Sequence, residues 1–235
     1  MDLTRDGSTE RDDTRPSSTT TALTIGVLGA GRVGTAVARQ AVRAGHTVKI
    51  ATARPAAEIR LLTEVIVPGA SAVDSYELRG ADLIVLAAPL HRYRSFDVET
   101  LRGHIVVDVT NYWSEVDGRI EEFEAGLSTS EVLAEYLGEQ VRLVKTLNHI
   151  GYGLIETDAK PAGTPGRRAL AMAGDDEDAK ELVGGFVDGL GFDVVDAGSL
   201  SAGRAFENAT PIFEGEFTAP EMERLLAEAR VLVGA

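Results

Sequence analysis

Two hydrophobic periodicities alternate along the chain from residue 22 onward. Short apolar runs are typical of buried strands, and apolar residues that recur every three or four positions are typical of helices. The runs predict strands over residues 23–28, 47–51, 83–88, 105–109, 142–146, 169–173 and 192–196. The helical spacing predicts helices over residues 32–44, 58–62, 128–137, 175–190 and 218–232. Ser128, with Glu131 three residues later, predicts a capping box at the start of the helix over 128–137.

The order of these elements indicates the fold class. Strands that are apolar on both faces and alternate with helices are typical of a parallel sheet covered on both sides. We therefore predict an α/β fold, a doubly wound parallel sheet of the Rossmann type. After residue 147 the predicted sheet becomes sparser, and residues 160–168 are rich in Pro and Gly, which indicates a loop. The predicted division is a main domain over residues 22–147 and a smaller C-terminal α/β domain over residues 148–235.

The first 21 residues differ from the rest of the chain. Only Met1 and Leu3 are apolar, and the others are mostly Asp, Arg, Ser and Thr. Such a segment buries too little surface to offset its ordering entropy, and it lacks the apolar stretch of a secretory signal. We predict a disordered tail over residues 1–21.

Composition and charge narrow the classes of partner. The 235 residues are 44% hydrophobic and carry a formal net charge of −14, which repels nucleic acid and anionic membranes. We therefore expect a small-molecule substrate, with any anion held by a local site. The apolar runs are too short for a membrane span. The chain has no cysteine, which excludes disulfides and thiolate chemistry and suits a cytoplasmic protein. Its four histidines are scattered, so we expect no metal site.

A glycine-rich motif follows the first predicted strand and begins the first predicted helix. Residues 29–34 read Gly-Ala-Gly-Arg-Val-Gly, which fits the G-x-G-x-x-G pattern of dinucleotide sites in the context that the pattern requires. The glycines permit a tight turn, a close approach to a pyrophosphate and close packing of helix on strand. The helix N-terminus offers N–H groups to the anion. The candidate pyrophosphate-binding residues are Gly29, Ala30, Gly31, Arg32, Val33 and Gly34.

The residues after the second predicted strand distinguish NADP from NAD. An NAD site usually has a carboxylate about 20 residues after the glycine motif, where it holds the ribose hydroxyls. This chain has Ala51-Thr52-Ala53-Arg54 there. The Arg54 guanidinium and the Thr52 hydroxyl suit a 2′-phosphate, which predicts a preference for NADP of about one to two decades. The alternatives are a solvent-exposed arginine and a hydroxyl that only closes a local turn.

The residues that follow two later predicted strands are further candidates for the dinucleotide site. Ala87 and Pro89 follow the third long strand, where small residues let a nicotinamide lie close to the backbone. Thr110 and Asn111 follow the next strand and are candidates to bind the ribose or the carboxamide. A purely structural role is the alternative for each of them.

These segments together resemble a known family. Residues 25–34, 45–54, 81–89, 105–111 and 144–148, with later segments up to residue 200, resemble the NADP-dependent oxidoreductases of the deazaflavin coenzyme F420. The resemblance covers nearly all of residues 22 to about 211. It implies that the glycine motif binds the pyrophosphate, that Thr52 and Arg54 bind the 2′-phosphate, and that Ala87, Pro89, Thr110 and Asn111 edge the nicotinamide. It also implies F420 as co-substrate and a homodimer, as in many members.

The chain departs from the family pattern in its N-terminal tail and at two further places. Residues 112–127 form a longer insertion that contains Trp113, and the usual Phe-Asn-Thr turn is replaced over residues 147–152 by Leu-Asn-His-Ile-Gly-Tyr. The replaced turn over residues 147–152 lies where the hydride partner is expected to bind. The motifs therefore specify NADP more closely than they specify that partner.

Three hypotheses about function remain open. The first is hydride transfer between NADP(H) and F420, which needs two stacked rings and no catalytic acid; Arg92, Arg94, Arg167 and Arg168 are candidates to bind the acidic tail of F420. The second is NADPH-dependent reduction of a small carbonyl, imine, flavin or ferric chelate. A carbonyl or imine also needs a proton, for which His149 is the candidate donor and Asn148 a candidate to orient the substrate. The third is a non-catalytic NADP-binding module.

Overall fold

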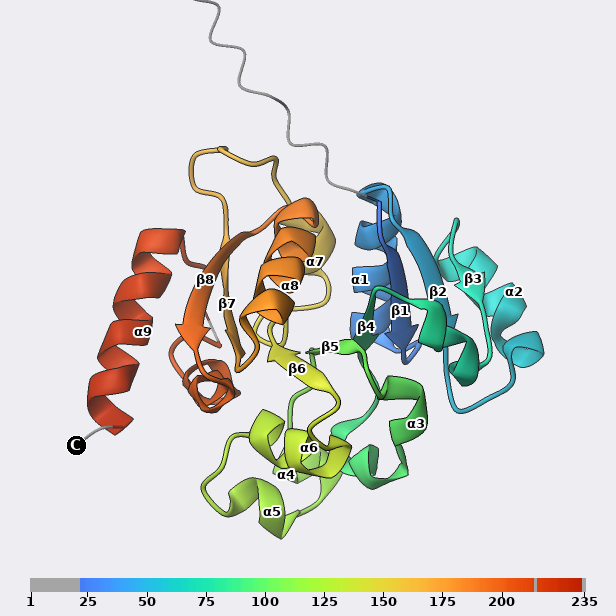
Figure 1. Ribbon diagram of the computed structural model, residues 1–235. Helices are drawn as coiled ribbons and strands as arrows, with labels where there is room; N and C mark the ends of the chain where they lie inside the picture. Colours follow the sequence, from blue (N-terminus) through green and yellow to red (C-terminus); the bar gives the residue numbers. More distant parts are fainter. Residues whose placement is uncertain (1–21, 214, 234–235) are drawn as a thin grey trace, which may run out of the picture.

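The computed structural model describes residues 22–213 and 215–233. The tail predicted over residues 1–21 lies outside the described residues. Eight strands form a single sheet in the order β3-β2-β1-β4-β5-β6-β7-β8 (Figure 1). The strands are β1 Thr24–Leu28, β2 Thr47–Ala51, β3 Ser71–Ala72, β4 Leu83–Leu86, β5 Ile105–Asp108, β6 Arg142–Lys145, β7 Ala169–Gly174 and β8 Asp193–Gly198.

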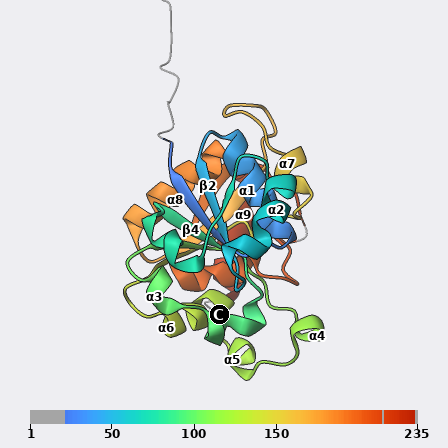
Figure 2. The ribbon, with the colours of Figure 1, turned by 90° about the vertical axis from the view of Figure 1, so that its right-hand side faces the viewer.

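Helices connect the strands and include several short ones. The α-helices are α1 Arg32–Arg43, α2 Ala56–Ile66, α3 Val98–Leu101, α4 Ser114–Asp117, α5 Glu121–Glu124, α6 Thr129–Leu137, α7 Leu154–Thr157, α8 Glu177–Gly189 and α9 Ala219–Val233. The 3₁₀ helices are η1 Ser75–Gly80, η2 Leu90–Ser95 and η3 Leu200–Phe206. Both ribbon views show α3, α4, α5 and α6 gathered at one end of the sheet (Figures 1 and 2).

The strand order creates a switch point beside β1. From β1 the chain builds outward through β2 and β3, and it then returns to the other side of β1 to form β4, β5 and β6. These six strands pair in parallel. In doubly wound sheets the ligand crevice lies outside the carboxyl ends of the strands at this point. The α/β doubly wound prediction is therefore confirmed.

The prediction of a parallel sheet is wrong at one position. β7 pairs with β6 in the antiparallel direction, and β8 then pairs with β7 in parallel. The connection over residues 146–168 contains the short helix α7 and a loop, whereas parallel crossovers usually contain a longer covering helix. The apolar pattern of β7 does not reveal this reversal, because a strand buried on both faces is a continuous apolar run whether it pairs in parallel or antiparallel.

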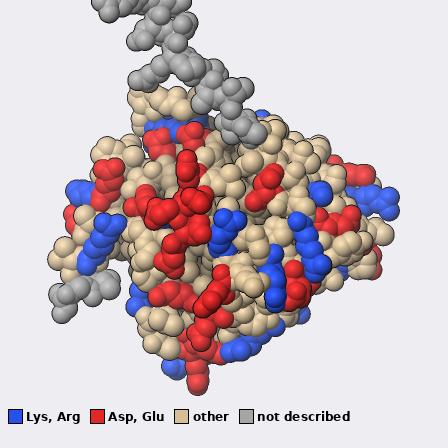
Figure 3. Space-filling model, viewed as in Figure 1, with Lys and Arg blue, Asp and Glu red and all other residues tan. Residues whose placement is uncertain are grey.

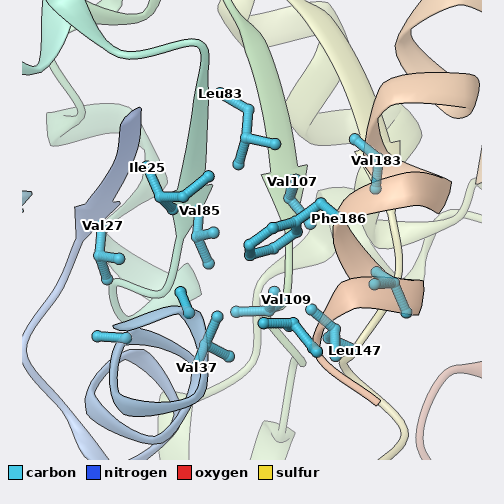
Figure 4. Packing of buried hydrophobic residues seen from close by; sticks show 14 of the residues in the cluster. Ile25, Val27, Val37, Leu83, Val85, Val107, Val109, Leu147, Val183 and Phe186 are labelled. Atoms are coloured by element: carbon cyan, nitrogen blue, oxygen red, sulfur yellow. The ribbon is translucent and has the colours of Figure 1, made fainter. Parts of the chain in front are cut away.

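Helices α1 and α8 cover one face of the sheet. Figure 4 shows Val37 of α1 and Phe186 of α8 against side chains of β1, β4 and β5, all of them buried. A second cluster on the other face packs α6, η1 and η2 against the same strands. A third cluster packs Met222 and Leu226 of α9 against β7 and β8 of the same chain.

Most predicted elements match the structure within a few residues. The capping box predicted at Ser128 is confirmed, because its side chain accepts from the Glu131 N–H and Glu131 accepts from the Ser128 N–H. Helix α2 is longer than the predicted 58–62, because it begins at Ala56 and ends at Ile66. The 3₁₀ helices and the four-residue helices have too few residues for a periodicity to be detected.

The predicted domain boundary at residues 147 and 148 lies within the sheet and its largest core cluster. Glu156 of α7 pairs with Arg39 and Arg43 of α1, and Gln40 of α1 donates to the Leu190 carbonyl at a distance of 2.9 Å. The two segments are thus in direct contact. Whether each folds independently stays a prediction.

Acidic residues gather on the outer surface. Figure 3 shows a band of carboxylates down the middle of one face, and Glu177, Asp178 and Glu181 of α8 are exposed. Among the described helices, none has both the length and the apolar composition needed to cross a membrane.

Candidate active site

The turn after β1 has space only for glycine at two positions. Gly29 has a φ of 123°, and a Cβ there would lie 2.5 Å from the Ala87 carbonyl oxygen. A Cβ on Gly34 would lie 2.1 Å from the Gly29 carbonyl oxygen. Any side chain at these positions would separate α1 from the sheet. The glycines therefore bring the start of α1 against the ends of β1 and β4.

Gly31 has open space around it, unlike Gly29 and Gly34. It is the N-cap of α1, and a Cβ built on it would meet nothing within 4 Å. The first intrahelical bond runs from the Thr35 N–H to the Gly31 carbonyl, at 3.0 Å. The N–H groups of Arg32, Val33 and Gly34 precede that bond, and they point out of the helix N-terminus with its partial positive charge. This open space in front of N–H donors fits a phosphate group.

A cavity of about 780 Å³ lies at the switch point. It is lined by the glycine turn, the residues that follow β2, β4 and β5, part of η2, and Tyr152. The predicted cofactor residues that line it are Gly29, Ala30, Gly31, Arg32, Val33, Thr52, Ala87, Pro89, Thr110 and Asn111. Gly34 lies behind the turn, and Arg54 is exposed outside the lining. The structure therefore brings together almost all of the candidates.

Thr52 and Arg54 form a local turn after β2. The Thr52 hydroxyl oxygen accepts from the Arg54 N–H at 3.1 Å. The Thr52 hydroxyl therefore closes a local turn, which was the alternative to binding the 2′-phosphate. Thr52 also lines the cavity. Within the described residues, no carboxylate pairs with the Arg54 side chain. Its guanidinium is available to an anion at this end of the cavity.

Asn111, Asn148 and His149 form one hydrogen-bonded chain. Asn111 donates to the Asn148 carbonyl at 2.7 Å, and Asn148 donates to the Asn111 side chain at 3.1 Å and to the Phe206 carbonyl at 2.9 Å. Asn111 lines the cavity, whereas Asn148 and His149 are buried behind it. Asn148 therefore supports Asn111 from the second segment of the chain.

His149 has the surroundings of a structural residue. Its Nε2 accepts from the Ala171 N–H at 3.0 Å, so its Nδ1 carries the proton and donates to Asn148 at 3.2 Å. Burial, followed by the charges of Arg168 and Lys145, lowers the pKa of His149 from 6.5 to about 3. The ring is neutral near pH 7, and both of its nitrogens are engaged. This geometry favours positioning of the turn over proton donation, and the catalytic role stays a prediction.

A buried ion pair lies beneath the end of β5. The Lys145 ammonium donates to Asp108 at 3.0 Å and to the Thr110 carbonyl at 2.6 Å, and both charged side chains are fully buried. Asp108 also accepts from the Thr110 N–H and hydroxyl and from Ser130. Sequence reasoning missed Lys145. The signal available was a lysine within an apolar strand, since an unpaired charge is almost never buried.

Two aromatic side chains line the cavity at different positions. Trp113 lines it, is 41% exposed, and has its ring 5.5 Å from that of Phe213. Tyr152 lines it as well, and its hydroxyl accepts from Arg32 at 3.3 Å. The cavity therefore has a flat apolar surface at Trp113, after β5, and a phenol hydroxyl at Tyr152, beside the glycine turn.

The candidate anion-binding arginines differ in their pairing. Arg167 pairs with Asp188 and Asp193, and Arg168 pairs with Asp158, so these two are structural. Arg94 pairs with Glu122. Arg92 lines the cavity, and no carboxylate within the described part of the chain forms an ion pair with it. Of the four candidates, only Arg92 is placed to meet a ligand.

Comparison with known proteins identifies the class of this site. Residues 24–112 match the family model described as NADP oxidoreductase, coenzyme F420-dependent. The chain is an NADP-linked oxidoreductase. The matched residues include the glycine turn, Thr52, Arg54 and the segment after β5 as far as Tyr112. The sequence-based resemblance is thereby confirmed, and so is the prediction of an NADP-dependent enzyme.

Solved structures share the fold over nearly its whole length. A hypothetical protein from Sinorhizobium meliloti is 25% identical, with a TM-score of 0.69, and the match covers 83% of this chain and 94% of the other. A protein provisionally named an F420-dependent NADP reductase, from Arthrobacter, is also 25% identical, with a TM-score of 0.66 and coverage of 91% and 94%. Both matches extend well beyond the matched family segment.

More distant structures show the fold alone. The 3-hydroxyisobutyrate dehydrogenase of Mycobacterium tuberculosis is 16% identical, with a TM-score of 0.54, and the match covers 78% of this chain and 57% of the other. No curated protein sequence matches the chain.

Proposed function

We propose that the protein transfers a hydride between NADP(H) and the deazaflavin coenzyme F420. The observation that carries the proposal is one continuous cavity, which extends from the glycine turn to Trp113 beyond β5. A cavity of about 780 Å³ has the size of sites that enclose a large ligand. The match to the F420-dependent family over residues 24–112 supports the choice of acceptor.

The residues present fit NADP. Gly31 leaves open space in front of the first N–H groups of α1, which would hold the pyrophosphate. Thr52 and Arg54 would hold the 2′-phosphate at the end of β2, with Arg92 as a further cation. Ala87, Pro89, Thr110 and Asn111 would border the nicotinamide at the ends of β4 and β5.

The reaction needs positioning more than acid–base chemistry. When bound, NADPH supplies a hydride to the deazaflavin ring, and with one proton from solvent the products are NADP⁺ and the reduced deazaflavin. The chain has to hold two rings about 3–3.5 Å apart and exclude water from between them. A neutral, fully engaged His149 is consistent with such a reaction, because both partners carry the hydride themselves.

A second candidate function rests on Tyr152. Its hydroxyl lines the cavity and lies 3.3 Å from the Arg32 guanidinium. A phenol in that position is able to donate the proton that reduction of a small carbonyl or imine requires. This candidate predicts that Tyr152→Phe lowers turnover about 100-fold or more, whereas transfer to F420 would change little.

The test is a parallel turnover assay. Purified protein receives NADPH with F420, with free flavin mononucleotide or with a small cyclic imine, and the loss of NADPH fluorescence is followed. We expect fast oxidation with F420. The control variant Gly31→Asp places a carboxylate in the open space before α1, and it should lose NADPH binding in calorimetry. No oxidation with F420 by a protein that binds NADPH tightly would overturn the proposal.

A further inference from the structure

We propose that the indole of Trp113 is the surface on which the planar ring of the hydride acceptor stacks, so that the insertion over residues 112–127 selects ring-shaped acceptors. This inference rests on the proposed function, and it names the part of the site that recognises the second substrate. The insertion is a departure from the family pattern.

The extended backbone after β5 alternates its side chains. Asn111 and Trp113 line the cavity, whereas Tyr112 between them is buried in the core on the other side. Trp113 has φ −127° and ψ 98°, which is extended backbone, so alternate side chains point in opposite directions. The direction of the indole is therefore set by the strand that precedes it.

Several hydrogen bonds anchor this segment. The Tyr112 hydroxyl donates to the Gly118 carbonyl at 3.0 Å and accepts from the Ile120 N–H at 2.8 Å. Asn208 donates to the Tyr112 carbonyl at 2.8 Å, which ties the insertion to the segment after η3. The short loop around Trp113 is thus held on both sides.

Trp113 itself is attached to η2 through Asp117. The backbone N–H of Trp113 donates to one carboxylate oxygen of Asp117 at 2.9 Å, and the other oxygen pairs with His91 at 2.8 Å. Phe213 contacts the indole edge-on, with an interplanar angle of 71°. The indole contacts Phe213, and Trp113 is 41% exposed and lines the cavity. A fixed, uncovered aromatic ring is a preorganised stacking surface.

The sheet order places Trp113 at the acceptor end of the cavity. A dinucleotide at the switch point has its pyrophosphate at β1 and its adenosine toward β2, which leaves the nicotinamide toward β4. Strand β5 lies one strand beyond β4 and three strands from β2, or about 14 Å at ordinary strand spacing. Trp113 follows β5, so it lies past the nicotinamide, where the second ring must enter.

The sole tryptophan makes the proposal directly measurable. The protein is saturated with NADP⁺ and titrated with oxidised F420, or separately with flavin mononucleotide, while steady-state and time-resolved tryptophan fluorescence are recorded. Ring contact predicts static quenching, in which the intensity falls and the lifetime stays constant. Energy transfer without contact would shorten the lifetime, and that result would overturn the proposal.

Substitutions supply a second readout. Trp113→Ala should lower kcat/KM for the acceptor about tenfold to a hundredfold, mainly through KM, which is the typical effect of losing one stacking contact. Trp113→Phe should stay within about threefold of wild type, because a phenyl ring retains a stacking face. Both should bind NADPH as the wild type does. Val116→Ala is the matched control, since Val116 lies in the same insertion, is 83% exposed and does not line the cavity.

The outcomes separate this inference from the proposed function. Turnover of F420 with unchanged kinetics in Trp113→Ala would overturn the inference and leave the proposed function intact. Static quenching by flavin mononucleotide, with weaker binding in Trp113→Ala but no turnover of F420, would support the inference and overturn the proposed function. If Trp113→Ala does not fold, the lifetimes of the wild-type protein still decide.

Discussion

At the scale of single residues, His149 links stability to pH. Its pKa is lowered from 6.5 to about 3 in the folded chain, mainly by burial. An unfolded chain therefore binds a proton at this residue between these two values, and the folded chain does not. The contribution of His149 to the free energy of unfolding is complete above about pH 6.5. It is lost as the pH falls from 6.5 to about 3.

We expect His149→Gln to reduce this pH dependence. Gln keeps an acceptor for the Ala171 N–H and removes the titrating ring. Between pH 7 and pH 5 the wild type should lose about 2 kcal/mol more of its free energy of unfolding than the variant. Urea unfolding at both pH values measures the difference, and equal losses would contradict the assigned pKa.

The same variant tests the catalytic prediction for His149. Removing a general acid typically costs 10²–10⁴ in rate, whereas a positioning residue replaced by a similar acceptor costs far less. We expect NADPH turnover at pH 7 within about threefold of wild type. A large loss of kcat with NADPH affinity retained would instead favour the donor role.

Arg54 is the residue that we expect to discriminate between the two nicotinamide dinucleotides. Its exposed guanidinium follows β2, and its N–H is held by Thr52. Arg54→Gln should reduce the kcat/KM ratio of NADPH to NADH about tenfold to a hundredfold, because a charge-assisted bond to the 2′-phosphate is lost. Arg60→Gln on the exposed face of α2 is the control. A ratio that Arg54→Gln leaves unchanged would place the 2′-phosphate elsewhere.

At the scale of elements, the Lys145–Asp108 pair joins β6 to β5 and to the loop that follows β5. Lys145→Met removes one charge and leaves Asp108 buried and partly unpaired. We expect a loss of about 3–5 kcal/mol in the free energy of unfolding, the usual cost of breaking a buried pair. The double variant Lys145→Met with Asp108→Asn should recover part of this loss in urea unfolding. A double variant less stable than Lys145→Met alone would show that the pair is not the main interaction.

The elements also show where local sequence was informative. Helix α1 was predicted within one residue, because its glycine turn and its apolar spacing are both local signals. The helices of the insertion were not predicted, because each has four residues and is held by contacts such as that between Asn208 and Tyr112. Short elements of this kind depend on partners that are distant in the chain.

At the scale of the whole molecule, β6 and β7 decide how the site is completed. Beyond this antiparallel pair, the segment after β8 contacts earlier parts of the chain, because Phe213 contacts Trp113 of the insertion and the Phe206 carbonyl accepts from Asn148. A parallel continuation would have placed the C-terminal segment elsewhere. Neither the direction of β7 nor these contacts has a signal in the local pattern.

The amino-acid sequence by itself determined the doubly wound class, the glycine turn, the candidate NADP residues and the capping box at Ser128. Each of these depends on steric limits or periodicities within a few residues of the chain. Only the tertiary structure decided that Lys145 is paired, that both ring nitrogens of His149 are engaged and that Trp113 lines the cavity. Those outcomes depend on contacts between distant segments, and burial and hydrogen bonding become defined only when the sheet has brought the segments together.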